Sequence, residues 1–158
     1  MVIDSTVLSN FALVGAVDLL ATACSGGGIT TSFVITELQN GQGLGKLPPL
    51  DMSWLQVVAL TTEENECSQR LRGRLGAGEA SCLAVAMQRR LPLLTDDLVA
   101  RKIAMREGVC LSGTIGVLVG LVDSAVIPLH VANELLGKMI RVGYFASFRK
   151  IDHLVGLE

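Results

Sequence analysis

Acidic side chains on four separate segments are the residues of this chain whose types and spacing could do chemistry. They are Asp4, Glu37, Glu79 and the adjacent pair Asp96 and Asp97. Carboxylates repel one another when a fold gathers them, so such a cluster needs cations in the gap. The cations that prefer oxygen ligands are Mg²⁺ and Mn²⁺. The pattern therefore predicts metal-dependent chemistry on phosphate esters.

Each acid also has a plain structural interpretation. Asp4 follows an apolar run and could be only a helix N-cap, and Asp96–Asp97 could be a turn and cap. Glu37 could lie on a solvated face, and Glu79 could complement a helix dipole. No single acid is specific, and the combination carries the hypothesis.

Short apolar runs alternate with segments of helical periodicity. We expect strands at residues 1–3, 29–31, 54–60, 93–95 and 109–111, with 144–148 as a candidate edge strand. We expect helices between residue 5 and Gly15, near 17–20, and over 33–39, 61–75, 79–90, 98–107, 114–122 and 129–141. Glycines and prolines predict a turn at 26–28 and an exposed loop at 40–51.

This alternation predicts a parallel sheet wrapped by helices. Ligands bind such sheets at the carboxyl ends of the strands, so the acids can share one rim. Ser5 or Thr6 could cap the first helix, which would leave Asp4 free for a metal. Thr61 and Glu64 have the spacing of a capping box.

Length and composition set broad limits. With 158 residues, a single domain over 1–158 is expected. Hydrophobic residues make up 50% of the chain and the mean hydropathy is +0.52, which fits a two-sided buried sheet and an apolar patch for a second copy or a partner protein. The net charge of −2 neither favours nor excludes a polyanionic substrate.

Other residue types point away from zinc, disulfides and membranes. The cysteines are widely spaced and are expected to be buried thiols of a reducing compartment: Cys24, Cys67, Cys82 and Cys110. The two histidines have no Cys or His at ligand spacing. No apolar run reaches the length of a spanning helix, about 18 residues, so the expected location is cytoplasmic.

Most basic residues are expected on solvated faces. Arg101 and Lys102 are the exceptions, because they lie one turn beyond Asp97. We expect these two to contact a phosphate backbone.

Five segments, in order along the chain, resemble sequence motifs of PIN domains. Val2–Leu8 resembles their opening, Thr36–Leu38 their second acid, Gly76–Ser81 the Gly-x-Gly-Glu-Ala segment with the third, and Leu94–Asp97 the fourth. Gly113–Leu118 is similar to a segment of a prokaryotic subgroup close to the VapC-like toxins. The likeness covers about the first 120 residues.

The resemblance implies a PIN-like three-layer α/β/α fold and a nuclease, most often an endoribonuclease of toxin–antitoxin type that uses Mg²⁺ or Mn²⁺. Its substrate would be single-stranded or structured RNA. Many members form homodimers and many are held inactive by an antitoxin protein. The carried-over catalytic and metal-binding quartet is Asp4, Glu37, Glu79 and Asp97, with Asp96 as a neighbour or substitute metal ligand, and Thr6, Thr95 and Thr114 near water or phosphate.

Two alternatives stay open. One is a catalytically inactive PIN-fold module that binds a protein partner. The other is a phosphatase with Asp4 as nucleophile, which would need a second Asp two residues on, where this chain has Thr6. The chain also departs from many PIN relatives in carrying Glu79 rather than Asp, and Leu98 where an aromatic residue often follows.

Overall fold

The centre of the protein is a five-stranded, all-parallel sheet. A computed structural model describes residues 1–25 and 27–156. The strands are β1 (Val2–Ile3), β2 (Gly28–Thr31), β3 (Leu55–Val58), β4 (Leu93–Leu94) and β5 (Leu111–Ser112), in the order β3-β2-β1-β4-β5. The parallel sheet and the order of strands and helices confirm the expected α/β architecture.

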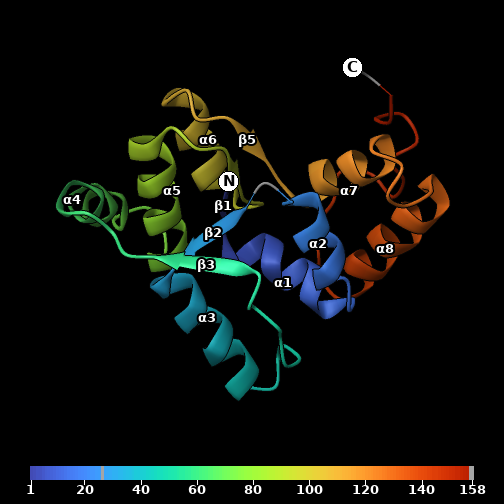
Figure 1. Cartoon of the computed structure of the whole chain (residues 1–158), viewed down its shortest axis with the longest axis horizontal. Helices are drawn as coiled ribbons and strands as arrows, with labels where there is room; N and C mark the ends of the chain where they lie inside the picture. Colours follow the sequence, from blue (N-terminus) through green and yellow to red (C-terminus); the bar gives the residue numbers. More distant parts are fainter. Residues whose placement is uncertain (26, 157–158) are drawn as a thin grey trace.

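Helices cover both faces of the sheet. They are α1 (Ser5–Leu13), α2 (Val17–Ala23), α3 (Ser32–Gly43), α4 (Thr62–Leu71), α5 (Ala77–Arg89), α6 (Leu98–Arg106), α7 (Thr114–Asp123) and α8 (Leu129–Arg141). In Figure 1, α4, α5 and α6 lie on one side of the strands, and α1, α2, α7 and α8 lie on the other. None of the helices in the described ranges is long and apolar enough to cross a membrane.

The strand order contains a topological switch beside the central strand β1. The chain moves from β1 outward to β2 and β3, then crosses back to place β4 on the opposite side of β1, with β5 beyond it. In open parallel sheets, ligands bind outside the carboxyl ends of the strands at such a switch point. Here the residues at that point are Asp4, after β1, and Thr95–Asp97, after β4.

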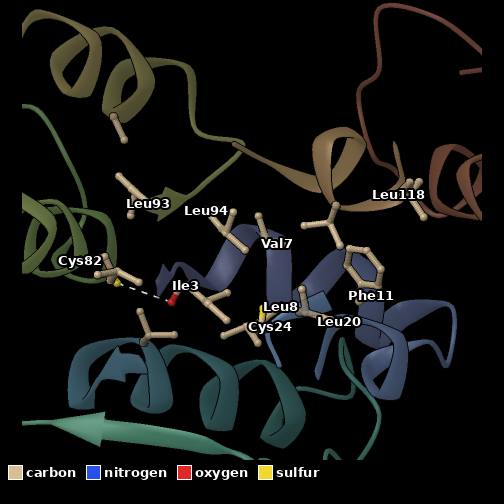
Figure 2. Close-up of a cluster of buried hydrophobic side chains, with 14 of the residues drawn as sticks. Ile3, Val7, Leu8, Phe11, Leu20, Cys24, Cys82, Leu93, Leu94 and Leu118 are labelled. Carbon is tan, nitrogen blue, oxygen red and sulfur yellow. Dashed lines mark hydrogen bonds between the residues drawn. The ribbon is translucent and has the colours of Figure 1, made fainter. Parts of the chain in front are cut away.

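One hydrophobic core joins the sheet to both helical layers. Figure 2 shows part of it around Ile3 of β1, with Leu94 of β4, Leu8 of α1 and Cys82 of α5. The Cys82 thiol lies 3.7 Å from the carbonyl oxygen of Ile3. Helix α5 packs on β1, β2 and β4 and is covered outside by α4. Most of its residues from Gly78 to Ala86 are small and buried, which allows this close packing on both sides. This packing fixes the amino end of α5 against the carboxyl rim of the sheet.

Several sequence expectations are confirmed in detail. The last helix has the expected bounds, Leu129–Arg141. Thr61 and Glu64 form the expected capping box, since Thr61 Oγ1 accepts from the Glu64 N–H at 3.2 Å and Glu64 Oε2 accepts from the Thr61 N–H at 2.8 Å. Cys24, Cys67 and Cys82 are buried thiols as expected, whereas the expectation was wrong for Cys110, which is exposed.

Other expectations were wrong. Residues 144–148 form no strand, because Gly143, at φ 111°, turns the chain out of α8 and Tyr144 is held to Asp96 instead of to a sheet edge. The expected loop at 40–51 is helical as far as Gly43, since α3 continues through the polar residues that follow Leu38. The last strand is Leu111–Ser112 rather than 109–111. Within the expected turn at 26–28, Gly26 lies outside the described residues.

An ion pair between the buried Glu64 and the exposed Arg89 joins α4 to α5. Arg89 Nε donates to Glu64 Oε1 at 2.6 Å and Arg89 Nη2 donates to Glu64 Oε2 at 2.9 Å. The same guanidinium also donates to the carbonyl oxygen of Ala59 at 3.0 Å. The hydrogen bonds from Arg89 lower the pKa of Glu64. Glu64 therefore stabilises the fold as an anion.

We expect Glu64→Gln to lower the free energy of unfolding by about 1–3 kcal/mol at neutral pH, because Arg89 loses a charged acceptor. Since the folded pKa of Glu64 is lowered, this stability is present above the unfolded pKa of a glutamate, about 4.3, and is lost as the pH falls through the folded value. Urea unfolding at several pH values measures the effect. The exposed neighbour Glu63→Gln is the control; equal unfolding curves for both variants would contradict the expectation.

Candidate active site

Asp4 is a buried carboxylate at the mouth of β1. Its N–H donates to the carbonyl oxygen of Leu94 at 3.0 Å, which continues the β1–β4 pairing. Asp4 Oδ1 accepts from the Ser5 N–H at 2.7 Å, while Oδ2 accepts from the hydroxyls of Thr6 at 2.9 Å and Thr95 at 2.7 Å. Asp4 is thus itself the N-cap of α1, contrary to the expectation that Ser5 or Thr6 would replace it. The cap uses one carboxylate oxygen and fixes the direction of the other.

Two threonine hydroxyls lock this geometry. Thr6 Oγ1 accepts from the Asp96 N–H at 3.0 Å, and Thr95 Oγ1 accepts from the Asp97 N–H at 3.2 Å. Because an ionised carboxylate can only accept, each hydroxyl donates its one proton to Asp4 while it accepts a backbone N–H. Thr6 and Thr95 therefore tie the carboxyl ends of β1 and β4 to the same carboxylate.

Glu37 and Glu79 reach the rim from helices. Glu37, on α3, accepts from the Gly78 N–H at 2.8 Å through Oε1. Glu79 stands in the first turn of α5. A Cβ at Gly76 would lie 2.5 Å from Glu79 Oε2, and a Cβ at Gly78 would collide with the Glu37 carboxylate. The two glycines of Gly76-Ala77-Gly78 therefore make room for the two glutamates.

A hydroxyl chain fixes the start of α5 to the end of β2. Ser81 Oγ donates to the carbonyl oxygen of Gly78 at 2.8 Å and lies 2.6 Å from Thr31 Oγ1. Thr31 occupies the N-cap position of α3, but its hydroxyl makes this contact rather than a cap. The helices that carry Glu37 and Glu79 are thus bound to each other and to the sheet.

The carboxylates share one electrostatic field. Burial is the main cause of the raised pKa of Asp4, opposed by its hydrogen bonds and reinforced by the charge of Glu37. Burial also leads the rise in the pKa of Glu79, followed by the charges of Asp4, Glu37 and Asp97. Across residues 1–25 and 27–156 the one ion pair is Glu64–Arg89, so no basic side chain neutralises this group.

The adjacent acids Asp96 and Asp97 face different ways. Asp97 Oδ1 accepts from the Ala100 N–H at 2.7 Å and caps α6, which leaves Oδ2 for a ligand. Asp96 accepts from the N–H and hydroxyl of Thr114, from Asn10 Nδ2 at 3.0 Å and from the Tyr144 hydroxyl at 3.4 Å. The charge of Asp97 is among the causes that raise the pKa of Glu79.

The two basic residues expected near phosphate differ in their contacts. Arg101 Nη1 donates to the carbonyl oxygens of Thr95 at 2.8 Å and Ser112 at 3.0 Å, so it joins the ends of β4 and β5. Lys102 is exposed on α6. Thr114, the third expected threonine, serves Asp96 rather than Asp4.

Sequence reasoning missed Asn10 and Tyr144. Asn10 lies one turn beyond Thr6 on the same face of α1, a spacing that could have indicated it. Burial and the nearby charge of Asp96 raise the pKa of Tyr144. Nothing local in the sequence links Tyr144 to Asp96, 48 residues away.

The donor set fits a hard divalent cation. All four gathered groups are carboxylates, which Mg²⁺ and Mn²⁺ prefer, and they lack a cationic partner within the described ranges. As the side chains stand, no three Asp, Glu, His or Cys residues of the described chain enclose a metal position.

Comparison with known families agrees with this geometry. The family model DUF3368, a PIN domain, matches residues 1–156. The chain therefore belongs to the PIN-domain family, whose fold is of nuclease type and whose nucleases generally use divalent metals. No curated protein and no solved structure matches the chain significantly.

The crowding at Gly78 predicts the effect of an alanine at this position. We expect Gly78→Ala to gain less stability than an alanine at an uncrowded helix position, because the new methyl group must displace the Glu37 carboxylate. Alanine in a helix otherwise stabilises by about 0.5–1 kcal/mol relative to glycine. Gly120→Ala in α7, where a Cβ meets nothing within 4 Å, should show that gain. Urea unfolding compares the two; equal gains would contradict the crowding.

The raised pKa of Glu79 predicts how the stability of the protein depends on pH. In metal-free protein the wild type should lose stability as the pH rises from about 4.3 through the raised folded pKa, because folding favours the protonated acid. Glu79→Gln lacks this loss and should be more stable at pH 7 by about 0.3–1 kcal/mol. Thermal unfolding with EDTA across this pH range checks it, with the exposed Glu66→Gln as control. A destabilised Glu79→Gln would refute the shared-field account.

Proposed function

We propose that this protein is a metal-dependent nuclease that hydrolyses phosphodiesters, with RNA as its substrate. The observation that carries the proposal is the group of four carboxylates without a basic partner among the described residues, gathered at the switch point of a PIN-family sheet. Such a group is costly unless a cation neutralises it. A polyanionic substrate needs the same cation.

Asp4 and Asp97 would hold one or two ions between β1 and β4, and Glu37 and Glu79 would complete the ligand set from α3 and α5. A bound Mg²⁺ or Mn²⁺ supplies activation of water and neutralises the charge that develops on the phosphate. Thr6 and Thr95 keep the Asp4 carboxylate in one orientation, and the Gly78 N–H does the same for Glu37. Oriented ligands limit the reorganisation that the reaction requires.

Asp96 has a different part in this proposal. Its carboxylate accepts from Thr114, Asn10 and Tyr144, so it is committed to holding α7, α1 and the segment after α8 together. We assign the fourth metal position to Asp97 and a positioning role to Asp96. Of the two basic residues expected near phosphate, Arg101 positions the ends of β4 and β5. The exposed Lys102 is the one of the two that would contact a phosphate.

We further propose that the nuclease is of the toxin–antitoxin type, acts in the cytoplasm and forms homodimers. The resemblance of Gly113–Leu118 to the VapC-like subgroup supports the type. Large exposed apolar side chains, among them Met105 and Val126, support a protein partner.

An inactive PIN-fold interaction module is the second candidate. The observation that favours it is the absence, among the described residues, of three acids already close enough to hold an ion. A module of this kind would not bind Mn²⁺. A nuclease would bind it, and the ion would stabilise the fold by about 2.7 kcal/mol at a hundredfold excess over its dissociation constant.

The decisive experiment is cleavage of a labelled single-stranded RNA with Mn²⁺ or Mg²⁺ against EDTA. We expect wild-type cutting that depends on the metal and falls by about 100-fold or more in Asp4→Asn, since loss of even an indirect partner of a metal costs about 10–100-fold. Asn fits this position because the hydroxyls of Thr6 and Thr95 can rotate.

Asp18→Asn, exposed on α2, is the matched control and should cut like the wild type. Thermal unfolding with and without Mn²⁺ runs beside the assay. Stabilisation of the wild type but not of Asp4→Asn would support the site. No cutting and no Mn²⁺ effect in folded wild type would favour the interaction module.

A further inference from the structure

A groove of about 640 Å³ opens beside the carboxylates and has no part in the chemistry described so far. It lies between α1, the start of α6 and the segment that follows α8; Figure 1 shows α1 and α8 on the same side of the sheet. Ser5, Thr6 and Asp97 line one end of it, so it is continuous with the site around Asp4. A substrate cut at the carboxylates would extend into this space.

An exposed phenyl ring stands in the groove. Phe145 has 86% of its surface exposed, and Leu98, which also lines the groove, has 68% exposed. Folding leaves these apolar groups in water, although the rest of the hydrophobic core is well buried. Large exposed apolar groups at a groove indicate a ligand-binding surface.

The backbone that leads into Phe145 is held by its neighbours. Gly143 takes a φ of 111°, which glycine alone adopts readily, and the Tyr144 N–H returns to the carbonyl oxygen of Met139 at 2.9 Å. The Tyr144 hydroxyl donates to Asp96. The hydrogen bond between Tyr144 and Asp96 thus places the next residue, Phe145, beside the acid site.

The lining of the groove fits a base better than a phosphate. Its charged lining residues are both acids, Asp96 and Asp97, and no basic side chain among its lining residues would attract a phosphate. The remaining polar lining comes from neutral groups, including Ser9 and Asn10. Neutral hydrogen-bonding groups beside an exposed aromatic ring match the edge and face of a nucleobase.

We propose that the groove binds an unpaired nucleotide adjacent to the cut phosphate, with its base stacked on Phe145. The proposal rests on the proposed nuclease function for the class of substrate. A base inside a duplex has both faces covered by its neighbours and could not stack there. Phe145 would therefore be a positioning residue that selects single-stranded RNA.

The test measures binding and cleavage of a short labelled single-stranded RNA. Stacking of one base on an aromatic side chain is worth about 1–3 kcal/mol, so Phe145→Ala should weaken binding by about 5- to 150-fold. Phe145→Trp should bind like the wild type. Leu44→Ala removes a similarly exposed apolar side chain at the far end of α3 and should change nothing. In cleavage, Phe145→Ala should raise KM more than it lowers kcat.

A substrate change makes the assignment specific. The same strand without its bases should bind the wild type as weakly as Phe145→Ala binds the normal strand, and Phe145→Ala should show no further loss. Equal binding of the normal strand by the wild type and Phe145→Ala would overturn the proposal. A residual effect of Phe145→Ala on the baseless strand would also overturn it.

The outcomes separate the two proposals. Anisotropy with Ca²⁺ in place of the reaction metal measures binding without cutting. If the wild type cuts RNA but Phe145→Ala keeps its KM and affinity, this inference fails alone. If the wild type binds through Phe145 but never cuts, the nuclease function fails alone. A change in sedimentation of Phe145→Ala without any change in RNA affinity would assign the groove to a second copy of the chain and refute the base-binding site.

Discussion

The structure depends on a buried negative charge at the mouth of its central strand. The Asp4 carboxylate is taken out of water between β1 and β4 and is held there by one N–H and two threonine hydroxyls. Those donors offset part of the desolvation cost, while the charge of Glu37 adds to it. The β1–β4 pairing, the start of α1 and the direction of the carboxylate are therefore a single arrangement.

The second helical layer is built to bring further carboxylates to the same place. Small residues let α5 pack closely on the sheet, and two glycines at its amino end leave room for Glu79 and for Glu37 from α3. The hydroxyl chain through Ser81 fixes this end to β2. A site of this kind costs stability without a cation, which is the usual relation between stability and function at a charged active site.

The Asp96–Asp97 pair divides two tasks between neighbouring residues. Asp97 turns to the group around Asp4, while Asp96 turns away to Thr114, Asn10 and Tyr144. A Cβ at Gly113 would collide with the Asp96 carboxylate, so the chain carries glycine just before α7, beside the hydrogen bonds of Asp96. Asp96 and Asp97, which follow β4, thus fix the position of the acid site relative to the groove beside Phe145.

The sequence by itself determined the features that depend on local interactions. Periodicity located the helices, with α8 at its observed bounds, the spacing of Thr61 and Glu64 predicted the capping box, and the alternation of strands and helices predicted the parallel sheet. It also predicted that acids following apolar strands would lie at one rim, as Asp4 after β1 and Asp97 after β4 do. Only the tertiary structure decided that Asp4 caps its own helix, that Asp96 and Asp97 diverge, and that residues 144–148 leave the sheet to place Phe145. Those outcomes depend on partners tens of residues away, and no local pattern encodes the direction in which a side chain finds such a partner.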